Sequence, residues 1–219
     1  MRWVRDLGSD YYNLPGYFRM HKEAKRWKYY RLSSAGHSVV TLDGENQNVT
    51  AVTQITDFKA DGNNGFAVAD LTSAYTPKAK RALRGVRMLD GRGVLVQDEL
   101  EIAHACSAQW AMTTDASITA AGASATLSLK GRTLTAHILS PAGATFTARS
   151  AEQKRPQASN KGVSQLIIRT NAKPGPLRFA VLLCPQPADG PDEKPNVKLA
   201  PLAQWNAPVI AEAADRDGR

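Results

Sequence analysis

Residues 87–102 of the chain read RMLDGRGVLVQDELEI, and this stretch decides the fold. Two apolar-rich arms lie on either side of a turn at residues 90–93, the pattern of an antiparallel hairpin. A second hairpin is expected at residues 125–139, where apolar and polar residues alternate about a Lys-Gly turn. Further strands are expected at 38–47, 65–71, 163–170 and 177–185. About ten or more short strands with little helix predict an all-β protein, an antiparallel β-sandwich of two layers.

The rest of the chain adds few elements to this prediction. A single weak helix is expected at residues 76–85, and residues 152–162 are expected to form an exposed polar loop. The sandwich domain is predicted to span 1–203, followed by a partly disordered tail at 204–219. Trp205 is the residue that could pack this tail onto the sandwich.

Composition limits the class of protein and of ligand. The chain has 219 residues, of which 42% are hydrophobic and 22% charged, the balance of a globular protein with one large domain. It contains no apolar run of the ~18–20 residues that a membrane-spanning helix needs. The formal net charge of +8 favours an anionic partner. Nucleic acid and acidic polysaccharide both satisfy this charge, and composition does not choose between them.

The N-terminal third differs from the rest of the chain. Eight of the fifteen aromatic residues lie within residues 1–50, and residues 19–31 combine six basic residues with three aromatic ones. Cations can meet carboxylate or sulfate groups, and flat rings can meet sugar faces, so the segment suits a polyanionic glycan. A charged edge strand with its aromatic side chains packed inward would have the same pattern. His37 follows a glycine at the start of a strand, which could fix its ring beside a cleft.

Four short motifs occur in an order that resembles the heparinase II/III family. They are Asp6-Leu7-Gly8, a strand-like Trp27–Arg31, Gly36-His37-Ser38, and Asp43-Gly44-Glu45-Asn46-Gln47. Looser matches follow at 68–75, 94–101, 110–114 and 138–146. The resemblance spans about residues 2–185 and implies the C-terminal β-sandwich region of a polysaccharide lyase. Ser38 stands where many relatives have asparagine, which leaves the local hydrogen bonding open.

The resemblance implies a metal site that this chain holds in part. Asp6 and His37 correspond to two ligands of a zinc ion, which accepts carboxylate oxygen and neutral imidazole nitrogen. A third ligand, a histidine, is expected upstream of residue 1, together with an α/α-toroid domain that carries further catalytic residues. Zinc is therefore expected as the cofactor, with an incomplete site in this chain.

The implied activity is β-elimination on a glycan that contains uronic acid, such as a glycosaminoglycan. Tyr11, Tyr12 and Tyr17 lie beside the Asp-x-Gly motif, and Tyr12 is the first choice among them as catalytic residue, with core packing as the alternative role. Trp27, Lys28, Tyr30 and Arg31 are the candidate substrate-binding residues. The chain alone is expected to be inactive, and the parent lyase is expected in the periplasm or cell envelope, although residues 1–12 contain no signal peptide. The alternative is a non-catalytic carbohydrate-binding or structural sandwich. A nucleic-acid partner is not expected, because no groove-reading element is found.

Overall fold

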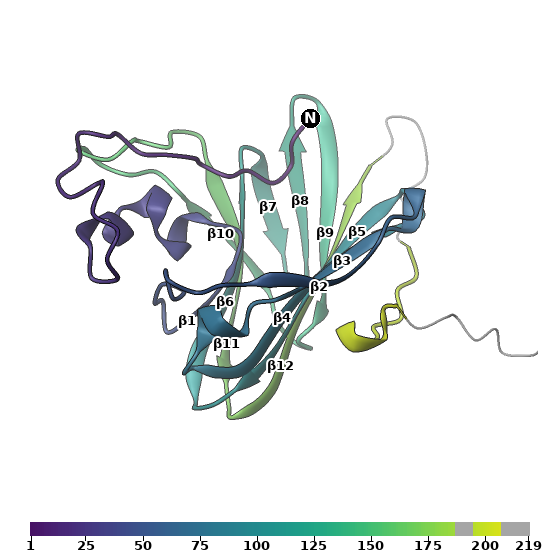
Figure 1. Cartoon of the computed structure of the whole chain (residues 1–219). Coiled ribbons are helices and arrows are strands. Elements are labelled where there is room, and N and C mark those ends of the chain that lie inside the picture. The colour runs from purple at the N-terminus through teal and green to yellow at the C-terminus, as the bar shows by residue number, and fades with distance from the viewer. Residues whose placement is uncertain (187–194, 207–219) are drawn as a thin grey trace, which may run out of the picture.

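The computed structural model describes residues 1–186 and 195–206, which form a two-layer antiparallel β-sandwich (Figure 1). The smaller layer has the strand order β1-β6-β11-β10, and the larger has β2-β3-β4-β5-β12-β9-β8-β7. The strands are β1 Val40–Leu42, β2 Gln54–Lys59, β3 Phe66–Asp70, β4 Ala79–Leu89, β5 Gly93–Ile102, β6 Cys106–Thr114, β7 Ser117–Ala121, β8 Ser124–Leu129, β9 Arg132–Ser140, β10 Phe146–Ser150, β11 Ser164–Ala172 and β12 Gly175–Pro185. The predicted all-β sandwich is confirmed.

Both predicted hairpins form, but the predicted helix does not. Asp90 and Gly91 have φ angles of 50° and 66°, the left-handed backbone that a tight hairpin turn between β4 and β5 requires. β4 begins at Ala79 and pairs with both β3 and β5. The helix expected at residues 76–85 is therefore wrong, because strand pairing on both sides overrides the helix propensity of its Lys, Arg and Ala residues. The one α-helical turn of the described chain, α1, lies earlier, at Thr72–Tyr75.

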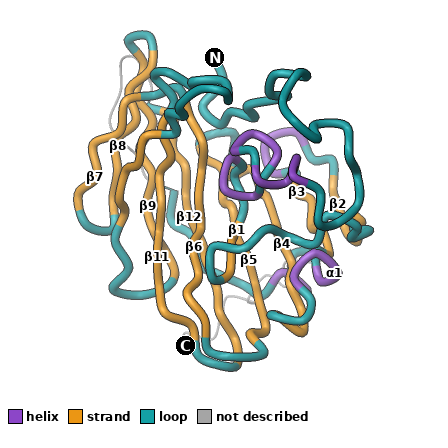
Figure 2. The backbone as a smooth tube through the Cα atoms, turned by 90° about the vertical axis from the view of Figure 1, so that its left-hand side faces the viewer, coloured by secondary structure: helices purple, strands orange, loops and turns teal. Residues whose placement is uncertain are grey.

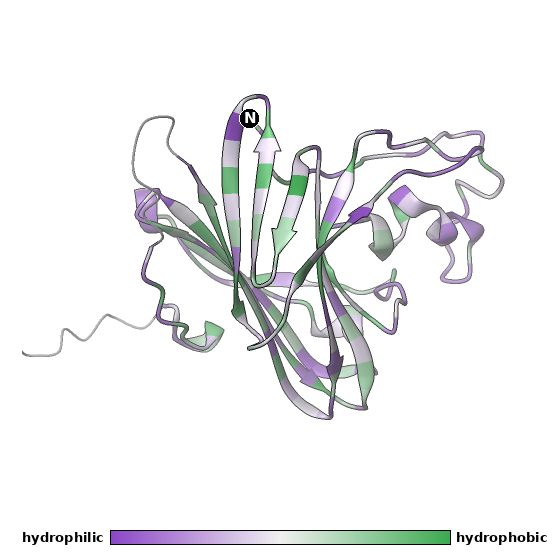
Figure 3. Ribbon diagram, turned by 180° about the vertical axis from the view of Figure 1, so that it is seen from behind, coloured by the Kyte–Doolittle hydropathy of each residue, from purple (hydrophilic) through white to green (hydrophobic). Residues whose placement is uncertain are grey.

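Alternating side chains build the core between the layers. The smaller sheet contributes Trp110, Met112, Leu166 and Ile168, and the larger contributes side chains such as Leu127 and Phe179, all at most 2% exposed. Figure 3 shows the resulting banding of apolar and polar residues along the strands. This period of two is what allows each sheet to bury one face and leave the other for further contacts.

The N-terminal third forms no strand before β1. Its regular elements are three short 3-10 helices, η1 (Lys25–Lys28), η2 (Tyr30–Leu32) and η3 (Ser34–Gly36). The strand expected at residues 27–31 is therefore wrong. Figures 1 and 2 show this segment, residues 1–39, beside the four-stranded sheet and outside the sandwich. Its backbone turns on itself because apolar and aromatic side chains pack locally, as Leu14, Tyr17 and Tyr29 do.

Residues 152–162 form a loop, as expected, but the loop is not fully exposed. Ala158 and Asn160 are each 6% exposed, because the loop lies against the N-terminal segment. The Ala158 amide donates to the Asp10 carboxylate at 2.9 Å, and the Tyr30 amide donates to the Gln157 side chain at 2.6 Å. Polar composition indicated solvent exposure here, whereas these polar groups are used in contacts between distant segments.

A C-terminal strap, residues 195–206, covers part of the outer face of the eight-stranded sheet. Leu202 and Trp205 are 1% and 4% exposed and pack with Phe66, Leu83 and Leu95. The predicted packing of Trp205 is thus observed; residues 207–219 of the predicted tail lie outside the described residues. Among the described residues, no helix is long and apolar enough to cross a membrane.

Gly85 tests how tightly the strap is held. A β-carbon at Gly85 would overlap the side chains of Leu202 and Trp205. We expect Gly85→Ala to lower the free energy of unfolding by about 1–3 kcal/mol, as overpacked substitutions do, measured by urea denaturation. In a Trp205→Ala background the same substitution should cost less, since the overlap with the ring is gone and Leu202 can move into the vacated space. Gly93→Ala, whose added carbon meets only ordinary contacts, is the control. Equal costs in both backgrounds would contradict this account.

Candidate functional site

His37 and Asp6, 31 positions apart in the sequence, meet beside the four-stranded sheet. Nδ1 of His37 lies 3.0 Å from Oδ2 of Asp6, and Nε2 lies 3.1 Å from the Arg31 carbonyl oxygen. The Arg31 carbonyl oxygen and the Asp6 carboxylate are both acceptors, and a neutral ring has one N–H to donate. A neutral ring therefore presents a lone pair to one of these two oxygens, and two acceptors repel each other. A second ring proton or a cation between Nδ1 and Oδ2 removes this conflict.

The loop that carries His37 is fixed from the smaller sheet. The Thr113 hydroxyl donates to the Gly36 carbonyl at 3.2 Å, and the Gln165 side chain donates to the Ala35 carbonyl at 2.9 Å. Ser38 accepts a hydrogen bond from the Thr113 amide at 3.0 Å through its hydroxyl. A serine at this position therefore supplies a hydrogen-bond acceptor to β6. Gly36 has to lack a side chain, because a β-carbon there would overlap the Tyr30 carbonyl oxygen.

Asp6 is held by a local turn. Its Oδ1 accepts a hydrogen bond of 2.7 Å from the amide of Gly8, which has a φ angle of 66°. The Asp-x-Gly spacing therefore fixes the carboxylate through a local turn. Oδ2 is left to face His37. Both side chains remain accessible, with 67% of Asp6 and 34% of His37 exposed.

The turn after β1, residues 43–47, holds the 3-10 helices in place. The Asn46 side chain donates to the Trp27 carbonyl at 2.7 Å and accepts from the Ser34 amide at 2.8 Å. Asp43, with a φ angle of 54°, accepts from Lys78 at 2.7 Å. Lys78 and the Ser107 amide hold the pKa of the Asp43 carboxyl below its usual value. The turn that carries the Asp-Gly-x-x-Gln motif therefore acts as a brace, that is, it holds the segment of the candidate site in place by hydrogen bonds.

Trp27 and Lys28 line an open pocket of about 550 Å³. Residues 44–49, which follow β1, also line it. The guanidinium of Arg26 lies 4.7 Å from the centre of the Trp27 ring, which stabilises the ring by a cation–π contact. An aromatic ring and a lysine on one side of an open pocket can contact a charged sugar.

Tyr30 and Arg31 face the interior of the segment. Tyr30 packs against the cluster of Leu7, Ala151 and Val163, and burial raises the pKa of its phenol. Arg31 donates to the Asn160 side chain at 2.7 Å and to the Ser9 carbonyl at 2.8 Å. The structure thus gives both residues contacts that join the N-terminal segment to the 152–162 loop.

Tyr12 lies in an exposed aromatic cluster with Tyr17 and Phe18. Its ring centre is 5.2 Å from that of Tyr17 and 5.7 Å from that of Phe18, and the side chain is 63% exposed. In the described structure no hydrogen bond joins Tyr12 to Asp6 or His37. The hydroxyl can contact a ligand. In the described structure no direct contact joins it to the His37–Asp6 pair.

Several residues that position the site were missed by the sequence reasoning. Thr113 and Gln165 sit in strand patterns that look like ordinary core, and Gln157 and Asn160 lie in a polar loop. No local motif marks any of them. The sequence offered one signal for Thr113 and Gln165, which is that both are polar residues within otherwise apolar strands. Such residues need hydrogen-bond partners when they are buried.

Asn46 gives a direct test of the brace. Asn46→Ala removes both hydrogen bonds to the 3-10 helices, and we expect about 1 kcal/mol of lost stability because the site is open to water. Amide hydrogen exchange should accelerate at residues 25–37 and stay unchanged in β4 and β5. Asn13→Ala is the matched control, since Asn13 is exposed and its side chain forms no hydrogen bond with a described residue. Unchanged exchange at 25–37 would show that the turn does not hold the segment.

Comparisons with known proteins agree with this architecture. A heparinase III structure with methylated lysines matches with a TM-score of 0.64 at 14% identity, covering 84% of this chain and 28% of that one. A mutant heparan sulfate lyase HepC from Pedobacter heparinus matches with a TM-score of 0.58 at 13% identity, covering 71% and 25%. This chain thus spans about a quarter of the length of these proteins. At such identities the likeness shows the shared fold.

A search of curated protein sequences found no match. The family described as "Heparinase II/III-like, C-terminal" matches residues 1–182. This range contains both sheets up to β12 together with the whole N-terminal segment, and it leaves out the C-terminal strap. On this evidence the chain belongs to the heparinase II/III-like C-terminal domain family.

Proposed function

We propose that the chain is the β-sandwich part of a polysaccharide lyase that cleaves acidic, uronate-containing glycans by β-elimination. The observation that carries the proposal is the pairing of His37 with Asp6, in a domain of the heparinase II/III-like family. The matched structures are named as heparinase III and a heparan sulfate lyase, and the net charge of +8 suits such polyanions.

Asp6 and His37 would hold zinc as two of its ligands. Metal-bound histidines usually donate their second ring N–H to a carbonyl or carboxylate, and Nε2 of His37 is directed to the Arg31 carbonyl in this way. Nδ1 then faces the carboxylate oxygen that would share the metal. Among the described residues no group of three or more His, Cys, Asp or Glu side chains could hold a metal. The remaining ligands would come from an upstream histidine and from water.

The N-terminal segment would form one wall of the substrate cleft. β-Elimination needs neutralisation of the uronate, a base for the C5 proton and an acid for the leaving oxygen. Trp27 and Lys28 line an open pocket and can meet the sugar ring and its carboxylate. The exposed Tyr12 hydroxyl can exchange a proton with substrate, as the role of base or acid requires. Tyr30 and Arg31 would support this wall through their internal contacts.

The other groups that β-elimination requires would come from a part of the parent protein beyond this sandwich. We propose an upstream α/α-toroid domain as the opposite wall, with the further catalytic residues. Polymeric glycans do not cross a lipid bilayer, so we place the parent protein in the periplasm or cell envelope. A zinc ion in the site would contribute positive charge and orientation near the cleft.

Zinc binding provides the first test. On addition of Zn²⁺ to the chain we expect the nitrogen NMR signal of His37 Nδ1 to shift while Nε2 is protonated, since a metal on Nδ1 leaves Nε2 to donate to the Arg31 carbonyl. Binding should be weak, and His37→Ala and Asp6→Ala should each lower the affinity at least about tenfold, as loss of one ligand from an incomplete site implies. His21→Ala, at a solvent-exposed histidine, is the control. An unshifted Nδ1 signal at saturating Zn²⁺ would contradict the assignment.

Turnover provides the second test. We expect the chain alone to produce no ultraviolet absorbance of unsaturated uronate from heparin, chondroitin or alginate, because one cleft wall carries only part of the acid–base chemistry. In a protein that also carries the upstream domain, Tyr12→Phe should lower kcat about a hundredfold or more, as removal of a general acid or base does. Robust turnover by the chain alone would refute the view that it is catalytically incomplete. A Tyr12→Phe enzyme with normal kcat would remove that residue from the mechanism.

A further inference from the structure

The outer face of the four-stranded sheet is only half covered. Around Thr113 and Gln165 it is buried beneath residues 34–38 of the N-terminal segment. Toward the other end of β6 and β11 the same face is open and forms a pocket of about 530 Å³. The pocket is bounded on one side by Ala35, two residues before His37.

Strand register gives this pocket a polar floor. Thr41 lies opposite Gln109, and Gln109 lies opposite Arg169, so one row of the floor crosses β1, β6 and β11. Ser107 and Asn171 form the next row of the floor. This row lies about 7 Å further along the strands, because residues two positions apart in one strand are separated by that distance. The floor therefore presents hydroxyl and amide groups, which can donate to and accept from sugar hydroxyls.

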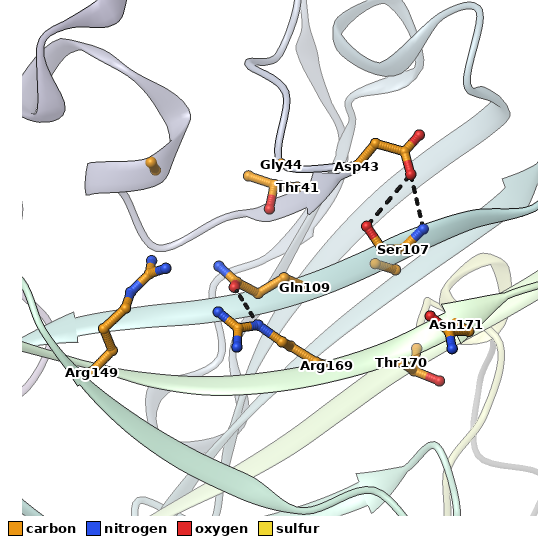
Figure 4. Close-up of a pocket in the computed structure, with 11 residues that line it drawn as sticks. Thr41, Asp43, Gly44, Ser107, Gln109, Arg149, Arg169, Thr170 and Asn171 are labelled. Atoms are coloured by element: carbon orange, nitrogen blue, oxygen red, sulfur yellow. Dashed lines mark hydrogen bonds between the residues drawn. The ribbon is translucent and has the colours of Figure 1, made fainter.

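Two arginines approach the pocket from neighbouring strands. Figure 4 shows Arg149 on β10 and Arg169 on β11, with their guanidinium groups directed toward the same part of the pocket. Arg169 donates through Nε to Gln109 at 3.0 Å, and Arg149 donates through one terminal nitrogen to Gln165 at 2.7 Å. Within the described residues these are their only side-chain hydrogen bonds, so each guanidinium keeps further N–H groups for a ligand.

The charge of the pocket is not balanced from within. Asp43 is the one acidic residue among those that line it. Its carboxylate is engaged at the far end of the pocket by Ser107 and by Lys78, as Figure 4 shows for Ser107. No acidic side chain forms an ion pair with Arg149 or Arg169 in the described structure. Two unpaired guanidinium groups above a polar floor favour an anion with several oxygens.

This pocket adjoins the one that contains Trp27 and Lys28. The two share Ala35 and Gly44 as lining residues, so ligand could pass from one into the other along the turn after β1. A row of cations, Lys28 in one pocket and Arg149 with Arg169 in the other, then follows a single surface path. Repeating negative charges on a linear polymer match such a path.

We propose that the Arg149–Arg169 pocket binds an anionic substituent of an acidic glycan, a carboxylate or a sulfate ester, as a subsite beyond the His37–Asp6 pair. Arg149 and Arg169 hold the anion, and Gln109, Thr41 and Asn171 meet hydroxyl groups of the same sugar. The identity of the polymer rests on the proposed function; the pocket and its charge do not.

The test measures binding of defined oligosaccharides to the chain by calorimetry. The probes are a heparin oligosaccharide, which carries sulfate and carboxylate, an alginate oligosaccharide, which carries carboxylate alone, and an uncharged maltooligosaccharide. We expect Arg149→Gln/Arg169→Gln to weaken at least one acidic probe about tenfold or more, the effect of losing charge-assisted hydrogen bonds. Weaker binding of the heparin probe alone indicates that the pocket binds sulfate. Weaker binding of the alginate probe indicates that it binds carboxylate. The uncharged probe should not bind.

Lys130→Gln/Arg132→Gln is the matched control, because it removes the same two charges from exposed positions at the β8–β9 turn. It should change affinity by no more than about twofold, since distant surface charges are screened by salt. Arg149→Lys/Arg169→Lys keeps the charge and the fold but loses the planar fork, and should fall between wild type and the glutamine pair. Arginine Nε–Hε NMR signals of residues 149 and 169 should shift with the bound probe.

Equal weakening by the glutamine pair and the control pair would overturn the subsite and leave the proposed function standing. Failure of the wild-type chain to bind either acidic probe would also overturn it. The zinc-dependent shift of His37 is independent of both results, so it separates failure of the subsite from failure of the lyase assignment.

Discussion

The buried side chains of Gln165 and Thr113 impose the constraint on which the candidate site depends. Both are fully buried on the outer face of the smaller sheet, where an unpaired amide or hydroxyl would cost about 1–3 kcal/mol. The carbonyl groups of Ala35 and Gly36 supply the partners. The N-terminal segment is therefore fixed to the outer face of the smaller sheet, and the position of His37 follows from the hydrogen bonds made by its two preceding residues.

A second buried polar group acts on the same loop from the larger sheet. Arg84 on β4 forms a two-pronged ion pair with Asp98 on β5, and it also donates to the Ser38 carbonyl. Both side chains face the interior between the layers, with Asp98 3% exposed. Burying this pair costs desolvation free energy that the mutual hydrogen bonds offset, so its contribution is to fix geometry more than to add stability. Hydrogen bonds from both sheets thus hold residues 35–38.

The two outer faces of the sandwich are used differently. The C-terminal strap packs Leu202 and Trp205 against apolar residues of the larger sheet, a contact of the kind that contributes stability. The outer face of the smaller sheet carries polar and cationic side chains instead, half of it paired with the N-terminal segment and half open. The candidate metal pair and the proposed anion subsite therefore lie on the same side of the sandwich. The strap lies outside the matched range, 1–182, and the polar face lies within it.

The sequence by itself determined the strand hairpins, the all-β class and the two residue types of the candidate metal pair. These features depend on local patterns: alternation with a period of two, turn residues such as Asp90-Gly91, and short motifs around Asp6 and His37. Only the tertiary structure decided that residues 79–85 are strand, because pairing with β3 and β5 outweighs their helix propensity. It also decided that Tyr30 and Arg31 face inward and that Arg149 stands beside Arg169. The contacts of these residues are set by strand register and by hydrogen bonds between residues more than a hundred positions apart. No local pattern in the sequence indicates such contacts.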